Sequence, residues 1–341
     1  MSQSDNQLRT IASDETIDLA YAWLCHARRD AHHNHEIWHL RTHWAERKGA
    51  IQAQLLAGTY QFSPCKSCKV DGVSMSIWGP EDALVLKAMT LVLTEYLKPQ
   101  LSDDCYHLAG RGGQKGCVRE VESSIGNYNF VCRSDVNSYY ATIDHDVLIK
   151  QLKTYIQDEA VITLIKRMLD RVDDVHAELF HVTIGISNGN SLSPLLGAVY
   201  LDCMDKVLSA YCKQRGLRYF RYMDDWLILC NTRNQLRTVV KLMNQILEQV
   251  KQTKHPLKTY IGRIREQGLD FLGYSIGNKA MKGLGIAWQT WMNHLNKLQQ
   301  LYEQHATMDC LAEYVKRWLI WLRSGVDIDL RRALEDAEWK H

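Results

Sequence analysis

The sequence lacks several features that would assign it to a special class of protein. It has no apolar run of the roughly 18 residues that a membrane-spanning helix needs, and no basic start followed by an apolar signal segment. Its ten cysteines follow no disulfide-like spacing, so we expect a reduced, cytoplasmic protein. With only five prolines, no low-complexity stretch and no internal repeat, long linkers are not expected.

An excess of charge of one sign is also missing. The net charge is only +2 over 341 residues, so any surface that binds nucleic acid must be local. The composition is otherwise ordinary for a globular protein, with 46% hydrophobic and 23% charged residues, and it supplies ample material for a core. A chain of this length predicts about two domains, or one enzyme with several lobes.

The most informative stretch is the segment 217–231. Two apolar runs, Leu217 to Phe220 and Trp226 to Cys230, flank the adjacent carboxylates Asp224 and Asp225. This pattern predicts a β-hairpin that presents both carboxylates at its turn. Two such carboxylates repel each other unless a cation joins them, and Mg²⁺ is the usual partner of oxygen ligands. An ordinary Asp-Asp turn between two strands is the alternative, because Asp is common in turns.

The N-terminal segment 14–58 has a helical pattern, with Asp14 as the expected cap of the first helix. His35, His39 and His43 are spaced four apart, so one helix face would carry all three. A metal site is one interpretation. The interpretation we favour is an exposed polar face that contacts RNA phosphate.

Residues 60–78 predict two strands joined by a turn at 71–72, and a proline at the first helical position then opens a buried helix over 80–97. Cys65 and Cys68 form a single Cys-x-x-Cys pair. Because no second pair follows at zinc-finger spacing, a zinc site here is only a minor alternative.

A glycine-rich segment, 109–116, carries the cations Arg111 and Lys115, and Arg119 follows it. Glycines let a backbone approach a ligand closely, and Arg and Lys bind phosphate. No Lys-Ser or Lys-Thr pair follows in register, so this is not a Walker motif. A flexible surface loop is the alternative.

Residues 130–136 predict a strand that ends at the carboxylate Asp135, followed by a turn over 137–140. Asp144 is then the expected cap of a helix that begins near His145. A carboxylate at the end of a strand can point at the same place as the tip of the hairpin.

Helices are predicted for most of the remaining chain. Residues 146–170 should form two amphipathic helices, followed by a polar connection. Ser193 is the expected N-cap of a helix that runs through Leu208, with proline at its first position. Further helices are expected over 234–250 and within 288–322.

The tetrapeptide Tyr222-Met223-Asp224-Asp225 is the catalytic signature of reverse transcriptases, and the chain resembles that family at further points. Asp135 and, five residues later, the aromatic Tyr140 match the first catalytic motif. The other matches, in the family's order, are Ser187-Asn188-Gly189 with Ser193-Pro194, His255-Pro256-Leu257-Lys258-Thr259, and Leu269-Asp270-Phe271-Leu272-Gly273-Tyr274. The resemblance covers roughly residues 60–276.

The chain departs from the family pattern at two points. Ser187-Asn188 stands where the family has Pro-Gln, and Met75 stands near a position that usually holds an Arg. Contacts to the triphosphate would then come from Arg111, Lys69 and Lys115.

The resemblance implies an α+β right-hand polymerase, with fingers, a palm of antiparallel sheet plus helices, and a small helical thumb. The expected division is an N-terminal helical extension over 1–59, fingers and palm over 60–276, and a thumb over 277–341. Within the family, the chain is similar to the compact bacterial branch of group II intron-like, diversity-generating and defence-associated enzymes. We expect no room for an RNase H, endonuclease or extended maturase domain.

The resemblance also implies roles for individual residues. The expected catalytic residues are Asp135, Asp224, Asp225 and Lys258. Two Mg²⁺ ions, with Mn²⁺ as a substitute, would be held by Asp135, Val136, Asp224 and Asp225. The expected nucleotide-binding residues are Ser138, Tyr139, Tyr140, Asn188, Arg111 and Lys69, with Tyr140 beneath the sugar as a block to a 2′-hydroxyl. The expected nucleic-acid-binding residues are Lys115, Arg119, Gly189 and Gly273.

The function implied is RNA-directed DNA synthesis from dNTPs, with an RNA template and a DNA product. The expected partners are a dedicated structured non-coding RNA and an accessory protein or a second copy, in a bacterial retroelement or anti-phage defence system, with no membrane. Two alternatives stay open: an RNA-binding maturase-like or structural component whose polymerase is silent, and a polymerase that copies RNA into RNA.

Overall fold

The computed structural model describes residues 7–70, 73–175, 177–266, 268–277 and 283–328 of the chain. These residues belong to two compact units whose chain segments alternate. The first unit comprises 1–102, 136–204 and 245–253, and the second unit comprises 103–135, 205–244 and 254–341. Within the described ranges, no helix has the length and apolar character needed to cross a membrane.

The first unit is mainly helical. Its helices are α1 (Gln7–Ile11), α2 (Asp14–Ala27), α3 (Ile37–Thr42), α4 (Trp44–Leu56), α5 (Pro80–Leu97), α7 (Tyr139–Thr142), α8 (His145–Tyr155), α9 (Glu159–Leu169) and α10 (Ser193–Tyr200), with a short 3₁₀ turn at Lys98–Gln100. Helix α5 is apolar on most sides and packs against α1, α2 and α3, so its buried position is the one that the sequence predicted. The predicted pair of helices over 146–170 is confirmed as α8 and α9.

A four-stranded sheet completes the first unit, in the order β2 (Val73–Ile77), β1 (Cys65–Val70), β4 (Val172–Val175) and β5 (Glu178–His181). The antiparallel pair β1–β2 confirms the predicted strands, while the predicted turn at 71–72 lies outside the described residues. The hairpin β4–β5 was wrongly predicted as an irregular polar connection. Its side chains are half-buried or exposed and show no alternation, and β4 gains its order by pairing in parallel with β1.

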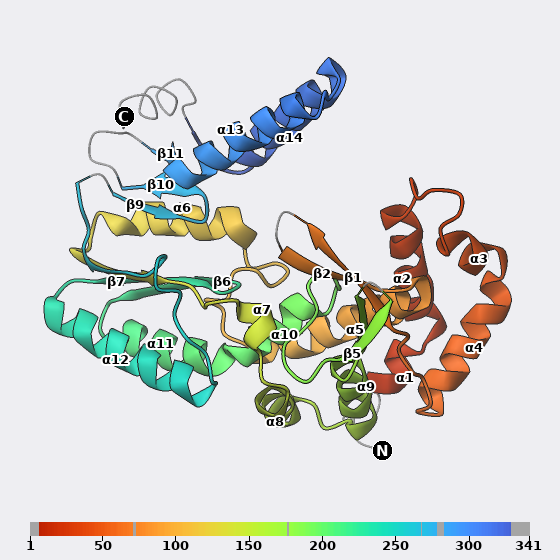
Figure 1. The fold of residues 1–341 in the computed structure, drawn as a ribbon. Coiled ribbons are helices and arrows are strands. Elements are labelled where there is room, and N and C mark those ends of the chain that lie inside the picture. The colour runs from red at the N-terminus through yellow and green to blue at the C-terminus, as the bar shows by residue number, and fades with distance from the viewer. Residues whose placement is uncertain (1–6, 71–72, 176, 267, 278–282, 329–341) are drawn as a thin grey trace. The chain divides into compact units, whose positions relative to one another are not determined.

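The second unit contains two sheets with α6 (Gly113–Ile125) between them (Figure 1). One sheet has the order β6 (Arg218–Tyr222), β7 (Asp225–Cys230), β3 (Phe130–Ser134) and β8 (Tyr260–Arg263), with every neighbouring pair antiparallel. The other has the order β11 (Gly285–Ile286), β10 (Tyr274–Ile276) and β9 (Leu269–Phe271). Val118 of α6, Phe220 and Leu227 of the first sheet and Tyr274 of the second belong to one buried apolar cluster.

Helices α13 (Trp288–Glu303) and α14 (Met308–Arg323) also belong to the second unit, and the chain passes from unit to unit within α11 (Asp202–Gln214) and α12 (Arg233–Gln249). These bounds confirm the helices predicted over 234–250 and within 288–322. The helix predicted from Ser193 through Leu208 is instead two helices, because the helical hydrogen bonding of α10 stops at Leu201.

Two predicted helix caps are wrong by a few residues. Ser13, not Asp14, caps α2, because its hydroxyl accepts the Thr16 N–H. At α10 the Oδ1 atom of Asn190 accepts the N–H groups of Leu192 and Ser193, each at 2.8 Å. The cap predicted at Asp144 is confirmed, since its side chain accepts the N–H of Val147 at the start of α8.

Gly185 supplies a test of backbone packing in the first unit. Its φ is +85°, and a Cβ atom there would lie 2.8 Å from the carbonyl oxygen of Ala141. We therefore expect Gly185→Ala to destabilise the protein by on the order of 2 kcal/mol or more, measured by urea denaturation. Gly49→Ala is the matched control, because that exposed helical site is open and alanine should stabilise it by about 0.5–1 kcal/mol. Equal stability of the two variants would contradict the strain argument.

Candidate active site

The antiparallel register of the second unit aligns the predicted catalytic groups. Ser134 of β3 pairs with Trp226 of β7, so the next step along both strands sets Asp135 opposite Asp225. On the other side of β3, Arg133 pairs with Tyr260, and the chain before this pair forms a turn over 256–258. The His255 N–H donates to the Asp135 carbonyl at 2.9 Å, and Lys258 lies in the turn. The sheet therefore sets Asp135 beside Asp225 at the ends of β3 and β7, and the turn before β8 supplies Lys258.

Asp135 and Lys258 are in direct contact. Lys258 Nζ donates to Asp135 Oδ2 at 2.6 Å, and this ion pair raises the pKa of Lys258 despite partial burial. Asp135 is only 2% exposed, and its other oxygen, Oδ1, is buried without a hydrogen-bond partner. An acceptor in that state carries a desolvation cost that a donor or a cation would relieve.

The two carboxyl groups of the hairpin turn have raised pKa values. Burial raises the pKa of Asp224, and the charge of Asp135 adds to the effect. Burial, followed by the charges of Asp224 and Asp135, raises the pKa of Asp225 to about 7, although Lys258 and Arg133 act in the opposite direction. The negative charges of neighbouring carboxylates thus oppose the ionisation of Asp224 and Asp225, so keeping both ionised costs free energy.

This donor set fits divalent cations. Two carboxyl groups whose pKa values are raised by burial and by neighbouring carboxylates, beside a buried oxygen of Asp135 without a partner, are what a hard, oxygen-liganded ion would stabilise. In the part of the chain that is described, no three His, Cys, Asp or Glu side chains are gathered closely enough to form a ready metal site. The ammonium of Lys258 lies against Asp135 in this arrangement.

The turn of the hairpin has an unusual backbone. Tyr222 pairs with Asp225, so Met223 and Asp224 are the two central residues. Met223 has φ +57°, a left-handed value that a non-glycine residue adopts at a cost of about 1–2 kcal/mol. Such strain persists where surrounding contacts hold it, and it is typical of functional turns.

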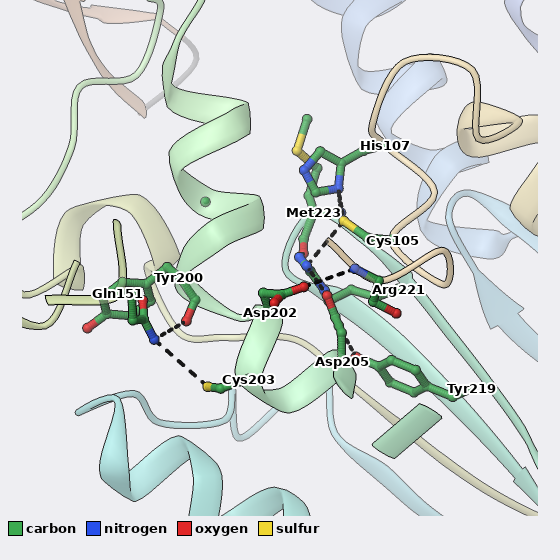
Figure 2. A network of polar contacts seen from close by, with 12 residues as sticks. Cys105, His107, Gln151, Tyr200, Asp202, Cys203, Asp205, Tyr219, Arg221 and Met223 are labelled. Atoms are coloured by element: carbon green, nitrogen blue, oxygen red, sulfur yellow. Dashed lines mark hydrogen bonds and ion pairs between the residues drawn. The ribbon is translucent and has the colours of Figure 1, made fainter. Parts of the chain in front are cut away.

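Two side chains that the sequence analysis missed hold this turn. Figure 2 shows Arg221, whose Nη1 atom donates to the Met223 carbonyl at 2.7 Å, and His107, whose Nδ1 atom accepts the Met223 N–H at 3.0 Å. An arginine inside an apolar strand could have indicated a buried partner. Nothing in the local sequence indicated His107.

The residues predicted to bind the nucleotide lie mostly in the first unit. Tyr139 is buried and its hydroxyl donates to the Gly197 carbonyl at 2.6 Å, so only its backbone could face a ligand. Tyr140 is half-buried beside it, with the ring centroids 5.5 Å apart. Ser138 is exposed and has φ +52°.

Asn188, Gly189 and Lys69 lie near the β1–β2 pair of the same unit. The Asn188 carbonyl accepts the Ser76 N–H at 3.0 Å, and Gly189 has φ +100°. A Cβ at Gly189 would meet the Ser76 carbonyl at 3.2 Å, so the glycine is needed for this close approach. The exposed Lys69 lies on β1.

The glycine-rich segment is only partly a loop, because α6 begins at Gly113 and includes Lys115 and Arg119. Lys115 was predicted to bind nucleic acid, but its ammonium lies 4.5 Å from the Tyr274 ring and 4.3 Å from the Trp321 ring. It also donates to the Trp321 carbonyl, and burial lowers its pKa to about 8. These contacts give Lys115 a packing role between α6, β10 and α14.

The remaining residues predicted to bind nucleic acid, nucleotide or metal differ in how exposed they are and in what they contact. Arg119 is exposed on α6, whereas the Arg111 side chain is only 9% exposed and pairs with Asp103 at 3.3 Å. Gly273 has φ +88°, and a Cβ there would meet the Trp321 ring at 3.1 Å, which explains the glycine by packing. The metal role of Val136 depends on its backbone, since its side chain is apolar and buried.

The expectation that one helix face carries His35, His39 and His43 is wrong, because α3 runs only over Ile37–Thr42 and both His35 and His43 lie outside it. The rings of His39 and His43 have centroids 4.4 Å apart. Cys65 and Cys68 are both free thiols on β1, and burial raises the pKa of Cys65 to about 12, which disfavours the thiolate that binds zinc.

The raised pKa of Asp225 predicts a pH-dependent stability. The folded protein holds this proton more tightly than the unfolded chain, so stability is complete below about pH 4 and falls as the pH rises toward about 7. Asp225→Asn should therefore be more stable than the wild type at about pH 8 in EDTA, by on the order of 1–2 kcal/mol once partial exposure is allowed for.

Urea denaturation in the absence of divalent ions is the measurement, and Asp146→Asn, on the exposed face of α8, is the control that should show no such gain. The advantage of Asp225→Asn should shrink toward about pH 4. A constant difference between the two proteins across this range would contradict the assignment.

Comparison with known proteins gives relatives that are similar over part of their length. A putative intron 1 protein of the COX1/OXI3 gene from Saccharomyces cerevisiae is 22% identical over 300 residues, which cover 70% of this chain and 36% of that protein. Protein YkfC of Escherichia coli K12 is 23% identical over 271 residues, covering 67% of this chain and 71% of that protein. The chain thus spans about a third of the yeast relative.

A telomerase structure from Candida albicans, in complex with a fragment of telomeric RNA, superposes with a TM-score of 0.54 at 12% identity, covering 67% of this chain and 46% of that one. This likeness shows the fold, which is the α+β polymerase fold that the sequence predicted. The profile of the family described as reverse transcriptase (RNA-dependent DNA polymerase) matches residues 83–276. That range is more than half of the chain and contains Asp135, Asp224, Asp225 and Lys258, so the chain belongs to the reverse transcriptase family.

Proposed function

We propose that this protein is an RNA-directed DNA polymerase that makes DNA on an RNA template by two-metal phosphoryl transfer. The observation that carries the proposal is the placement of Asp135 beside Asp225 by the register of β3 with β7, with Asp224 in the adjoining turn and Lys258 Nζ 2.6 Å from Asp135 Oδ2. Carboxylates from separate chain segments that converge in this way are what the reaction requires of a protein.

Each catalytic group has a proposed task. Asp135, Asp224 and Asp225 would hold two Mg²⁺ ions, which supply charge stabilisation to the attacking and leaving oxygens. Lys258 keeps its proton because Asp135 raises its pKa, so it can neutralise or protonate the departing pyrophosphate. The buried Oδ1 of Asp135 presents a lone pair whose desolvation is already complete in the folded protein.

The first unit would bind the nucleotide. We propose that the backbone N–H groups of Ser138 and Tyr139 meet the phosphates, and that the half-buried ring of Tyr140 lies under the sugar. Asn188, Arg111 and Lys69 are further candidates for nucleotide contacts. Arg119, which is exposed on α6, is a candidate for contact with nucleic-acid phosphate.

The template and partners follow from the same proposal. RNA is the proposed template and dNTPs are the substrates. Because the net charge is only +2, general tight binding of nucleic acid is not expected, and a dedicated structured RNA fits local cations better. A role in a retroelement or in phage defence, with an accessory protein or a second copy, completes the proposal.

Asp224→Asn tests the polymerase directly. The change removes charge and keeps shape, so we expect Mg²⁺-dependent primer extension on an RNA template to fall by at least about 100-fold while the urea denaturation curve shows a folded protein. Asp146→Asn should extend primers as the wild type does. Near-normal synthesis by Asp224→Asn would refute the assignment, and a wild type without synthesis would favour a silent polymerase.

Tyr140 provides a test of sugar selection. Tyr140→Ala should raise the efficiency of rNTP use relative to dNTP use on one primed RNA template, whereas Tyr140→Phe keeps the ring and should keep the discrimination. Tyr139→Ala is the contrasting core variant, because losing a buried aromatic costs about 3–5 kcal/mol and lowers all synthesis together. An unchanged ratio of the two efficiencies in Tyr140→Ala would exclude a steric gate.

A further inference from the structure

Both polar backbone groups of Met223 are bound by side chains from elsewhere in the second unit. The carbonyl accepts from Arg221 Nη1 at 2.7 Å, and the N–H donates to His107 Nδ1 at 3.0 Å. Met223 also has the left-handed φ of +57°, and it directly precedes Asp224. The side chains of Arg221 and His107 therefore fix the backbone of Met223, the residue of this turn with the left-handed φ.

The Arg221 contact is rigid because the arginine is itself fixed. Arg221 is fully buried and its Nε donates to Asp205 Oδ1 at 2.6 Å, while its Nη2 contacts Asp205 Oδ2. The Tyr219 hydroxyl also donates to Asp205 Oδ1, at 2.6 Å. A buried bidentate pair of this kind is costly to break, so Arg221 is a fixed support for the Met223 carbonyl.

The His107 contact is fixed by backbone pairing. The segment before His107 runs alongside β6, with the Arg221 N–H donating to the Asp104 carbonyl at 3.0 Å and the Tyr106 N–H donating to the Arg221 carbonyl at 2.8 Å. The His107 ring also meets the Tyr222 ring edge-on, with centroids 6.1 Å apart. The Nδ1 atom also lies 3.4 Å from the Cys105 sulfur, and it accepts the Met223 N–H only in a tautomer that leaves Nδ1 without a proton.

We propose that His107 is a positioning residue for the polymerase reaction. It does not touch substrate; it accepts the Met223 N–H and so keeps the strained turn in the one conformation that directs Asp224 toward Asp135 and Asp225. The inference rests on the proposed polymerase function. It adds a role for the segment 104–107, which contacts the hairpin turn and precedes the glycine-rich segment and α6 in the chain.

Two substitutions separate the hydrogen bond from the ring packing. His107→Asn keeps an acceptor oxygen near the position of Nδ1 but loses the ring, and His107→Phe keeps a ring against Tyr222 but loses the acceptor. If positioning is the role, kcat for primer extension should fall about tenfold or more in His107→Phe, because small misplacements of catalytic groups are costly. His107→Asn should retain kcat within about threefold of the wild type, and the KM for dNTP should change little in either variant.

A spectroscopic readout does not depend on activity. In ¹⁵N-methionine-labelled protein, assigned through Met223→Leu, the Met223 amide signal should move on His107→Phe and stay near its wild-type position in His107→Asn. The other methionine amides should be unchanged, which shows that the fold survives. His181→Phe, on the exposed strand β5, is the control for replacing a histidine by phenylalanine.

The possible results distinguish the proposed polymerase function from the positioning role of His107. A wild type that extends no primer, with the Met223 signal responding as described, would refute the polymerase function and leave the support of the turn intact. A wild type that extends primers while His107→Phe keeps wild-type kcat, or while His107→Asn loses as much as His107→Phe, would overturn the positioning role.

Discussion

The constraint on which the proposed site depends is the burial of carboxyl groups beside one another. Burial raises the pKa values of Asp224 and Asp225, and the negative charge of Asp135 raises them further. The sheet holds these carboxyl groups together because the register of β3 with β7 and β8 is fixed by buried apolar side chains such as Val131, Leu227 and Leu229. A slip of one residue would turn all of these side chains to the other face, so core packing and placement of the charges are inseparable.

Lys258 offsets part of the effect of these neighbouring charges. Its ammonium pairs with one oxygen of Asp135, and the other oxygen stays buried without a partner. The Lys258 side chain is 56% exposed and that of Asp135 is 2% exposed, so the ammonium of this pair is accessible to solvent. The same residue can therefore stabilise the carboxylates in the free protein and supply positive charge to the proposed reaction.

The second unit also stabilises the hairpin turn that carries Asp224. The buried Arg221–Asp205 pair adds nothing certain to stability on its own, because desolvation of both groups opposes their attraction. Its geometric effect is clearer: it holds a guanidinium against the Met223 carbonyl, while His107 holds the N–H. Strain at a functional turn persists when contacts of this kind determine the backbone from more than one side.

The sequence alone predicts those features of the fold that depend on interactions between residues close together in the chain. Local patterns were sufficient for the hairpin of β6 and β7, the strand that ends at Asp135, helix α5 and the Asp144 cap, because each depends on residues a few positions apart. The family motifs added the prediction that Asp135, Asp224 and Asp225 are catalytic. The exact caps of α2 and α10 were missed, since several neighbouring polar side chains compete for the same N–H groups.

Contacts between distant segments were decided only by the tertiary structure. β4 is a strand because it pairs with β1, and Lys115 packs between Tyr274 and Trp321 although its loop-like, basic surroundings indicated phosphate. His107 reaches Met223 through the pairing of segments more than a hundred residues apart, and the buried Arg221 is held by contacts with Asp205 and Cys105. A sequence pattern reports which residues can form helices, strands and turns, whereas the partner of a buried polar group is set by the packing of the whole unit.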